Sequence, residues 1–330
     1  MIRELTWILV LAAAVPAAAA AAGQGATAPL ELVRTIRLPD VRGRIDHLAV
    51  DPGGARLFVA ALGNDSVEVV DLHRGTRVAR ITGLHQPQGI GYVQSANRLF
   101  VANAGGGVDV FDASALRRAS RVPGLDDADN VRDDAAHGTV YVGYGHALAT
   151  LDATDGRLLG TVELAGHPES FQLESTGPRI FVNVPDAAQI AVVERSSRKV
   201  LDTWSIGAGR ANFPMALDEV DRRLFVATRR PAALLVFDTR AGALTAQLPL
   251  HGDADDLFYD AKRKRLYAIC GEGFVDVFQQ EDPDHYARAA EVRTVRGART
   301  GLFVAARDSL FVAVPAHAGA PAEIRVFAAR

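Results

Sequence analysis

The sequence predicts an all-β protein, a seven-bladed β-propeller, and three observations lead to that prediction. A five-residue phrase recurs seven times at a spacing of about 42 residues, from RLFVA at Arg56 to SLFVA at Ser309. Each phrase is rich in β-branched and aromatic residues and is bounded by Gly, Asp, Asn or Pro, as strands are. No helical periodicity accompanies the repeat, which argues against the helix-pair solenoids that have a similar period.

Each repeat contains four predicted antiparallel strands, and the recurring phrase is the second of them. A third strand follows after a turn, as in VEVVD at Val67 and VDVFD at Val108. A fourth strand comes next, as in residues 77–84, and the first strand precedes the phrase, as in residues 47–51. Four antiparallel strands in a unit of this length are typical of a propeller blade.

The seventh repeat lacks an outer strand, because the sequence stops at Arg330 directly after its third strand. Residues 30–39 (LELVRTIRLP) have the pattern of the other outer strands. We expect them to complete the seventh blade and close the ring, since an unpaired edge would be an aggregation hazard. The alternative is a leader strand that lies loosely on the surface. The predicted propeller is a single domain over residues 30–330.

The N-terminal residues predict an export signal. Arg3 supplies a positive start, residues 8–15 form a short apolar core, and residues 16–23 are small residues that suit cleavage. We therefore predict a signal peptide over residues 1–22 and a short leader over residues 23–29. An uncleaved anchor is the alternative. The expectation is a periplasmic or secreted monomer with no membrane span after cleavage.

Composition excludes several classes of protein. An apolar fraction of 48% and a charged fraction of 23% are those of a well-cored globular protein, which excludes disorder. The 36 basic and 39 acidic residues give a formal charge of −3, too balanced for non-specific nucleic-acid binding. Cys270 is the single cysteine, so an internal disulfide and a multi-cysteine zinc site are excluded.

Three of the phrases carry a family resemblance. LFVAN at Leu99, VYVGY at Val140 and LFVAT at Leu224 resemble the Tyr-Val-Thr-Asn signature of the YVTN-repeat, or YncE-like, propellers. The resemblance covers essentially the whole chain after the signal. It implies an exported seven-bladed propeller with a binding face, and the ligand differs among members. The sequence departs from WD40 repeats, because no Trp-Asp dipeptide closes a blade.

The inner strand of each blade begins ten residues before the recurring phrase, at the mouth of the channel. The residues there are Asp46, Gln88, Asp129, Glu169, Phe213, Asp255 and Arg299. The next position holds His47, Gly89, Asn130, Ser170, Pro214, Asp256 and Thr300. Two residues earlier than the first set lie Arg44, Gln86, Asp127, His167, Ala211, Asp253 and Gly297. Four carboxylates and one arginine in the first set exceed what packing requires, so we expect the functional site here.

Converging carboxylates repel one another unless they are hydrated, protonated or neutralised, which leaves three interpretations. The first is a water-filled channel in which Arg299 pairs with a neighbouring acid. The second is a divalent cation held by oxygen ligands, calcium or magnesium in preference to zinc. The third is a polar organic ligand bound by Arg299 and the acids. The candidate metal ligands are Asp46, Asp129, Glu169 and Asp255.

Other side chains at the same face complete the candidate set. His47 and His167 are candidate catalytic bases, and as metal ligands they would shift the preference toward zinc or another transition metal. Arg229 and Arg230 form a clustered cation that would hold an anionic group or be solvated. The candidate ligand-binding residues are Gln88, Asn130, Arg299, Thr300, Arg229 and Arg230.

The sequence therefore favours a propeller that binds a small polar molecule, a metal ion or a protein partner at this mouth. The alternative is a divalent-metal-dependent hydrolase of lactones or esters that uses the same site, with His47 or His167 as base. That layout resembles gluconolactonase-type propellers, although no motif aligns. No nucleic-acid partner is expected, because single-strand binding needs a basic groove with aromatic residues and this mouth is acidic.

Overall fold

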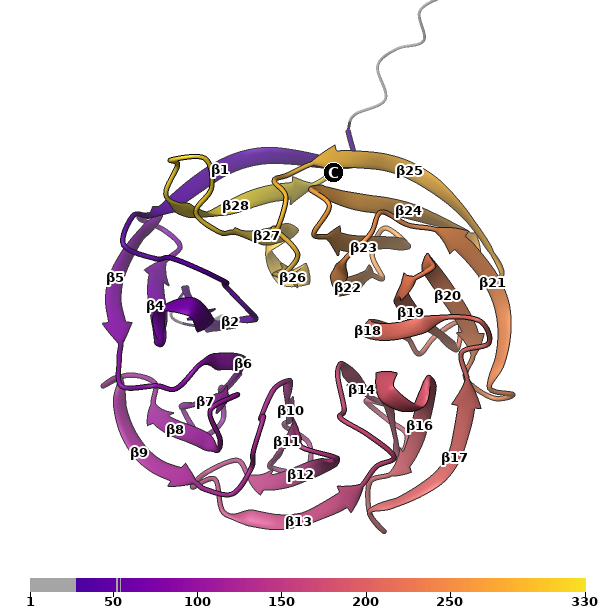
Figure 1. The fold of residues 1–330 in the computed structure, drawn as a ribbon, viewed down its shortest axis with the longest axis horizontal. Helices are drawn as coiled ribbons and strands as arrows, with labels where there is room; N and C mark the ends of the chain where they lie inside the picture. The colour runs from indigo at the N-terminus through magenta and orange to yellow at the C-terminus, as the bar shows by residue number, and fades with distance from the viewer. Residues whose placement is uncertain (1–27, 52, 54) are drawn as a thin grey trace, which may run out of the picture.

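The computed structural model describes residues 28–51, 53 and 55–330. The predicted signal peptide and residues 23–27 of the predicted leader lie outside the described residues. The described chain forms seven four-stranded antiparallel sheets arranged as a ring, which confirms the predicted seven-bladed propeller (Figure 1). No helix within the described residues has the length and hydrophobicity that crossing a membrane would require.

The blades follow one another in chain order around the ring. Blade 1 consists of β2 (Leu48–Asp51), β3 (Arg56–Ala61), β4 (Ser66–Asp71) and β5 (Thr76–Ile81). Blade 2 consists of β6 (Pro87–Val93), β7 (Arg98–Asn103), β8 (Val108–Asp112) and β9 (Arg117–Val122). Blade 3 consists of β10 (Val131–Asp134), β11 (Thr139–Tyr144), β12 (Ala147–Asp152) and β13 (Leu158–Glu163). Blade 4 consists of β14 (Phe171–Leu173), β15 (Arg179–Val184), β16 (Gln189–Glu194) and β17 (Lys199–Ser205).

The remaining blades have the same order of strands from the axis outward. Blade 5 consists of β18 (Arg210–Asp218), β19 (Arg223–Arg230), β20 (Ala232–Asp238) and β21 (Ala243–Pro249). Blade 6 consists of β22 (Ala254–Asp260), β23 (Arg265–Cys270), β24 (Phe274–Asp282) and β25 (His285–Arg293). Blade 7 consists of β26 (Gly301–Val304), β27 (Ser309–Val314), β28 (Ala322–Ala329) and β1 (Leu30–Leu38). The short 3-10 turns are η1 (Leu62–Asn64), η2 (Pro185–Ala187) and η3 (Ala305–Arg307).

Strand β1 closes the ring. It pairs antiparallel with β28, from Leu30 opposite Ala329 to Leu38 opposite Ala322. Figure 1 shows the first strand running along the outside of β28, next to the C-terminus. The prediction that the N-terminal segment supplies the missing outer strand is confirmed, and the last blade has no open edge on β28.

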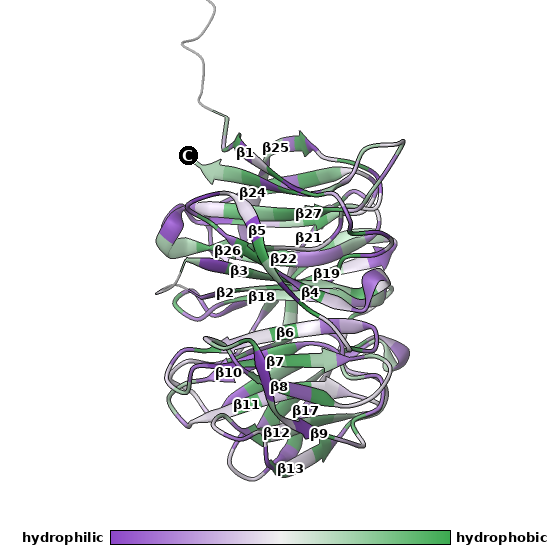
Figure 2. Cartoon of the chain, turned by 90° about the vertical axis from the view of Figure 1, so that its left-hand side faces the viewer, coloured by the Kyte–Doolittle hydropathy of each residue, from purple (hydrophilic) through white to green (hydrophobic). Residues whose placement is uncertain are grey.

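The core lies between blades. Each of seven clusters of buried apolar side chains spans one junction of two neighbouring blades within the described chain. The recurring phrase forms the second strand of each blade, and its apolar residues are buried on both faces, as Leu57 and Phe58 of β3 are. Figure 2 shows the resulting contrast, with hydrophobic colouring along the stacked strands and hydrophilic colouring in many connecting loops. Burial between blades is what holds the ring together.

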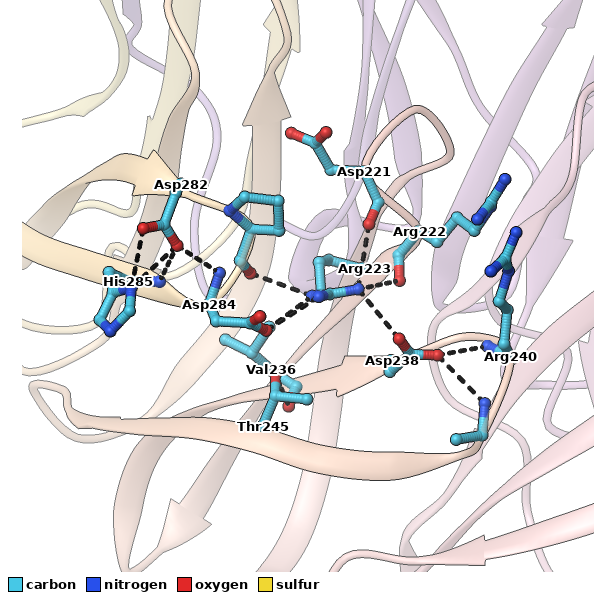
Figure 3. A network of polar contacts seen from close by, with 12 residues as sticks. Asp221, Arg222, Arg223, Val236, Asp238, Arg240, Thr245, Asp282, Asp284 and His285 are labelled. Atoms are coloured by element: carbon cyan, nitrogen blue, oxygen red, sulfur yellow. Dashed lines mark hydrogen bonds and ion pairs between the residues drawn. The ribbon is translucent and has the colours of Figure 1, made fainter.

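The arginine that opens the recurring phrase links neighbouring blades. Figure 3 shows it between blades 5 and 6, where Arg223 is 9% exposed and donates through Nε to the Pro283 carbonyl at 3.0 Å. The same guanidinium lies 2.8 Å from Asp284 Oδ1 and 3.2 Å from Asp238 Oδ2. A guanidinium can satisfy this many acceptors at once because its donors form a rigid planar fork.

The same contact recurs at four other junctions among the described residues. In each case the arginine of one blade donates to a backbone carbonyl of the next, which we call the arginine clamp. The donors and acceptors are Arg56 to Ala113, Arg98 to Thr154, Arg179 to Thr239 and Arg265 to Arg330. The phrases of blades 3 and 7 begin instead with Thr139 and Ser309.

Candidate functional site

The inner strands of blades 1, 3 and 4 enter the channel in the same register. The backbone N–H groups of Asp46, Asp129 and Glu169 donate to the carbonyl of the fifth residue of the phrase in their own blade, at 2.8, 2.9 and 3.0 Å. Because this register repeats, residues that are far apart in the sequence lie at the same height around one axis.

The turn before the inner strand has an unusual backbone conformation in four of the blades. Gln86, Asp127, Ala211 and Asp253 adopt left-handed conformations, with φ between 51° and 59°, two residues before the first set. Aspartate tolerates this region better than most residues, which accounts for two of the four. At Gly89, an added Cβ would lie 2.1 Å from the carbonyl oxygen of Asp129, so glycine permits blade 2 to approach blade 3 at the site.

Side chains from all seven blades converge on one polar cavity. Its volume is about 170 Å³. The lining residues are Arg44, His47, Gln88, Asp127, Asp129, Asn130, His167, Glu169, Ser170, Phe213, Arg229, Asp255 and Arg299. The convergence that the sequence predicted is therefore present in the structure. Asp46 is an exception, because it is 1% exposed beneath the cavity wall and is not among the lining residues.

One side of the cavity carries arginines whose charge is balanced by carboxylates. Asp255 lies between two of them, with Oδ1 2.5 Å from Arg229 Nη2 and Oδ2 2.9 Å from Arg299 Nε. Arg44 Nη2 lies 2.7 Å from Asp46 Oδ2. Arg299, the one arginine of the first set, is thus joined by Arg229, which the sequence placed at the same face, and by Arg44. Burial raises the pKa of Asp255 to about 6, although the two flanking guanidinium groups favour its charged form.

The opposite side carries acids that no arginine balances directly. One ligand atom each of Asp129, His167 and Glu169 lies within 4.8 Å of the others. Burial, together with repulsion from Asp46 and Asp255, raises the pKa of Asp129 to about 7 even though His47 opposes this. Burial and the nearby Asp129 and Asp255 likewise raise the pKa of Glu169 well above its usual value.

Some buried oxygen atoms on this side accept no hydrogen bond within the described residues. Asp129 Oδ1 is buried and accepts no hydrogen bond within the described residues. The Nδ1 atom of His167 lies 2.9 Å from the Gly145 carbonyl, so a neutral ring would donate there and leave the Nε2 lone pair free. Asn130 is 2% exposed, and its Oδ1 accepts no hydrogen bond from the described chain either. The set offers both nitrogen and oxygen ligands to a cation.

His47 occupies the middle of the channel. It lies 3.5 Å from Asp256 Oδ1 and 3.7 Å from both Asp46 Oδ1 and Asp129 Oδ1. Burial alone would lower the pKa of His47, but these three carboxylates together raise it to about 10. A protonated imidazole here is a counter-ion to these carboxylates, and the role of His47 as a general base stays a prediction. His47 also lines a second axial cavity of about 350 Å³ beyond the first.

Two candidate ligand-binding residues lie outside the cavity. Thr300 is 1% exposed and donates its hydroxyl to the Ile45 carbonyl at 3.1 Å, so it links blade 7 to blade 1. Arg230 is exposed and is not among the lining residues. Gln88, Asn130, Arg299 and Arg229 do line it. Arg44 and Asp127 also line the cavity, although neither was among the candidate site residues. Their position two residues before the start of the inner strand is the sequence feature that could have identified them.

The fold and the site define a seven-bladed β-propeller with a charged axial cavity. Among the solved structures that share the fold are the following two. A chain of the "Crystal Structure of Mitotic Checkpoint Complex" is similar with a TM-score of 0.76 and 12% identity over 98% of both chains. A chain of the "Kuenenia stuttgartiensis Hydrazine Synthase" is similar with a TM-score of 0.73 and 16% identity, over 87% of this chain and 96% of that one.

Comparison with known sequences assigns the chain to no family. No protein-family model matches the chain, and no curated protein matches it. At the identities of the two structures, the similarity establishes the propeller fold alone. Function has to be inferred from the cavity itself.

Proposed function

We propose that the protein is an exported, monomeric YVTN-like propeller that binds a divalent metal ion at Asp129, His167 and Glu169, and with it a small polar ligand. The YVTN-like assignment is supported by the recurring phrases, such as LFVAN at Leu99. Export is supported by the basic start, short apolar core and small residues at the N-terminus.

The metal site depends chiefly on one observation. Asp129 and Glu169, like Asp127, line the cavity without an ion pair to an arginine, and they converge with His167 to within 4.8 Å. Like charges in a buried site are costly unless cations neutralise them, and Asp129 Oδ1, which lies 3.7 Å from His47 Nε2, accepts no hydrogen bond. A divalent ion would remove both costs.

The mixed ligand set bears on which metal is bound. Two carboxylates and an imidazole whose second nitrogen contacts a backbone carbonyl suit a transition metal such as zinc. Calcium and magnesium prefer six or more oxygen ligands, and here Asn130 would have to contribute one. We therefore place zinc ahead of calcium, which reverses the order that the four-carboxylate set suggested.

The ligand would occupy the space between the metal and the arginines. Three ligands leave a zinc ion with an open coordination position. Arg229, stacked on the Phe213 ring at 3.9 Å, and Arg299 line the other side of the same cavity. A small carboxylate-bearing molecule fits this arrangement, because one oxygen could reach the metal while guanidinium groups bind the rest. A protein partner that inserts an acidic side chain would use the same chemistry.

The hydrolase alternative has less support. Metal-assisted ester or lactone hydrolysis needs a base near the attacking water. In the metal-free channel the surrounding carboxylates raise the pKa of His47 to about 10, which disfavours it as a base, and His167 would be engaged as a ligand. We therefore favour binding over catalysis.

The test is metal analysis of protein purified without chelator, followed by calorimetric titration of the chelated protein with Zn²⁺, Mn²⁺ and Ca²⁺. We expect about one transition-metal ion per chain and a rise in melting temperature on adding it. Asp129→Asn and His167→Gln should each weaken binding by about tenfold to a hundredfold. Asp133→Asn is the matched control, because it removes the same charge from an exposed residue of the same blade outside this cavity.

Each outcome separates the interpretations. Calcium binding with indifference to His167→Gln would favour an all-oxygen site. No binding of any cation, with no change on adding EDTA, would reject the metal and leave the water-filled channel. Hydrolysis of a lactone or ester panel that is lost in Asp129→Asn would restore the enzyme alternative.

A further inference from the structure

A second cavity lies away from the axis, at the junction of blades 3 and 4. Its volume is about 430 Å³, which falls within the range of small-molecule sites. Strands β11, β12 and β13 line it from blade 3, while the turns around residues 175–178 and 195–198 line it from blade 4. It shares no lining residue with the axial cavity among the described residues.

This junction lacks the arginine clamp that most other junctions have. Blade 3 has Thr139 where blades 1, 2, 4, 5 and 6 have the clamp arginine. At the 7–1 junction, where Ser309 opens the phrase, Arg34 of β1 takes over and donates to the Leu72 carbonyl at 2.8 Å. No arginine on the blade 3 side does so at the 3–4 junction within the described residues.

The arginine at the 3–4 junction instead comes from blade 4. Arg195 follows β16 directly, at the position that Ala113 and Thr239 occupy after the equivalent strands of blades 2 and 5. Its Nη1 lies 3.1 Å from Asp134 Oδ2 of blade 3. The arginine and the small residue have therefore changed places at this junction: blade 3 carries the small Thr139, and blade 4 carries Arg195. This exchange leaves space beside Thr139.

Three buried side-chain atoms that line this space make no hydrogen bond: Thr139 Oγ1, Thr150 Oγ1 and Arg195 Nε. The Thr150 side chain belongs to a residue that is 5% exposed, and its Oγ1 makes no hydrogen bond. The Arg195 side chain is 8% exposed, and its Nε–H donates to no acceptor, although its other nitrogens are engaged. Buried donors without acceptors are uncommon in native proteins and each costs free energy, so a bound group with oxygen acceptors would relieve these costs.

The remaining lining defines the class of ligand. It contains Arg198 and several hydroxyl side chains but no carboxylate, so it favours negative charge. Tyr141, Leu159 and Pro178 supply apolar surface. We propose that this cavity, which we call the interblade cavity, binds a small organic anion, with its oxyanion at Arg195 Nε and Thr150 Oγ1 and its apolar body against Tyr141 and Leu159.

The test uses benzoate, phenyl phosphate and inorganic phosphate as probes, and benzyl alcohol as the uncharged analogue of benzoate. Calorimetry and saturation-transfer NMR are run on EDTA-treated protein, so that a metal at the axis cannot bind the anions. We expect benzoate or phenyl phosphate to bind, and to bind more tightly than benzyl alcohol and inorganic phosphate.

Two variants locate the binding. Thr150→Val keeps the side-chain shape and removes the hydroxyl, which should weaken binding of the anion by about tenfold. The double variant Thr139→Arg with Arg195→Thr rebuilds the clamp seen at Arg179 and Thr239, fills the cavity and should abolish binding. Arg240→Gln removes one positive charge from an exposed turn of blade 5 and should change nothing.

The outcomes decide the proposal. Absence of binding by any probe to the wild-type protein overturns it. Equal binding by the wild type and the double variant also overturns it, and if the double variant does not fold, unchanged affinity in Thr150→Val does so instead. Asp129→Asn should bind the anions like the wild type, which separates this cavity from the axial one.

Discussion

His47 Nδ1 lies 3.5 Å from Asp256 Oδ1, so an ion pair links the inner strands of blades 1 and 6 at the axis. Asp256 also accepts the Gly301 N–H at 2.7 Å through Oδ2, which extends the link to blade 7. His47 lines both axial cavities, as Ser170 does. The imidazolium is the central positive charge among three carboxylates.

Replacing His47 should destabilise the fold. His47→Gln removes the positive charge and leaves Asp46, Asp129 and Asp256 repelling one another in a buried site, which should cost about 3 kcal/mol of unfolding free energy. Urea denaturation measures this loss. His285→Gln is the control, because that histidine is exposed and pairs with Asp282 on an outer turn. A native stability in His47→Gln, or an imidazole that titrates near 6.5 by NMR, would contradict the ion-pair role.

The metal-free protein should lose stability as pH rises from 5 to 9. The pKa values of Asp255, Asp129 and His47 are raised to about 6, 7 and 10, from 3.8, 3.8 and 6.5. A raised pKa means that the folded state holds the proton more tightly than the unfolded chain does. That stabilisation is complete below the unfolded value and is lost as pH rises through the folded value.

Melting temperatures across this pH range in EDTA measure the effect. Asp129→Asn should flatten the dependence between pH 5 and 8, because the amide cannot titrate. Added metal should offset the loss at pH 8, where a charged Asp129 becomes a ligand. A melting temperature that climbs steadily from pH 5 to 9 without metal would show that the axial acids are not held in their protonated forms.

The blades and the position of the cavity followed from the sequence for a physical reason. A second strand buried on both faces has to be continuously apolar, so the phrase around Phe58 recurs in every blade. The inner strand pairs with it in a fixed register, so counting back ten residues finds Asp129 and Glu169 beside one another. Repetition alone was enough to bring these distant residues to one axis.

The repeat pattern could not predict which acids in the cavity are paired with arginines. Asp255 is neutralised by Arg229 from the end of β19, a strand whose length differs from the equivalent strands of other blades. Asp46 turns toward Arg44 and leaves the cavity lining. Side-chain direction at strand ends depends on turn geometry and bulges that the repeat does not encode, so the sequence could not separate the balanced acids from the unbalanced ones.

Enlarging Gly89 should disturb the site without touching a charged group. In Gly89→Ala the new methyl group would lie 2.1 Å from the Asp129 carbonyl oxygen, which forces blades 2 and 3 apart. Overpacking of this kind costs about 1–3 kcal/mol, and metal affinity should fall because Asp129 moves. Gly53→Ala is the control, since its methyl group would make one ordinary contact, 3.7 Å from Asp51 Oδ1. Unchanged stability and metal affinity in Gly89→Ala would show that the blades can separate freely.

Removing β1 should open the ring. A chain that begins at Pro39 lacks the partner of β28 and exposes that strand's N–H and C=O groups as an edge. It also loses Ile36 and Leu38, which are 1% and 0% exposed in the core between blades 7 and 1. We expect a lower melting temperature and self-association through the exposed edge, measured by size-exclusion chromatography with light scattering. A chain that begins at Ala28 keeps β1 intact and should remain monomeric. Monomeric, equally stable protein from both chains would mean that contacts between blades close the ring without the final strand pair.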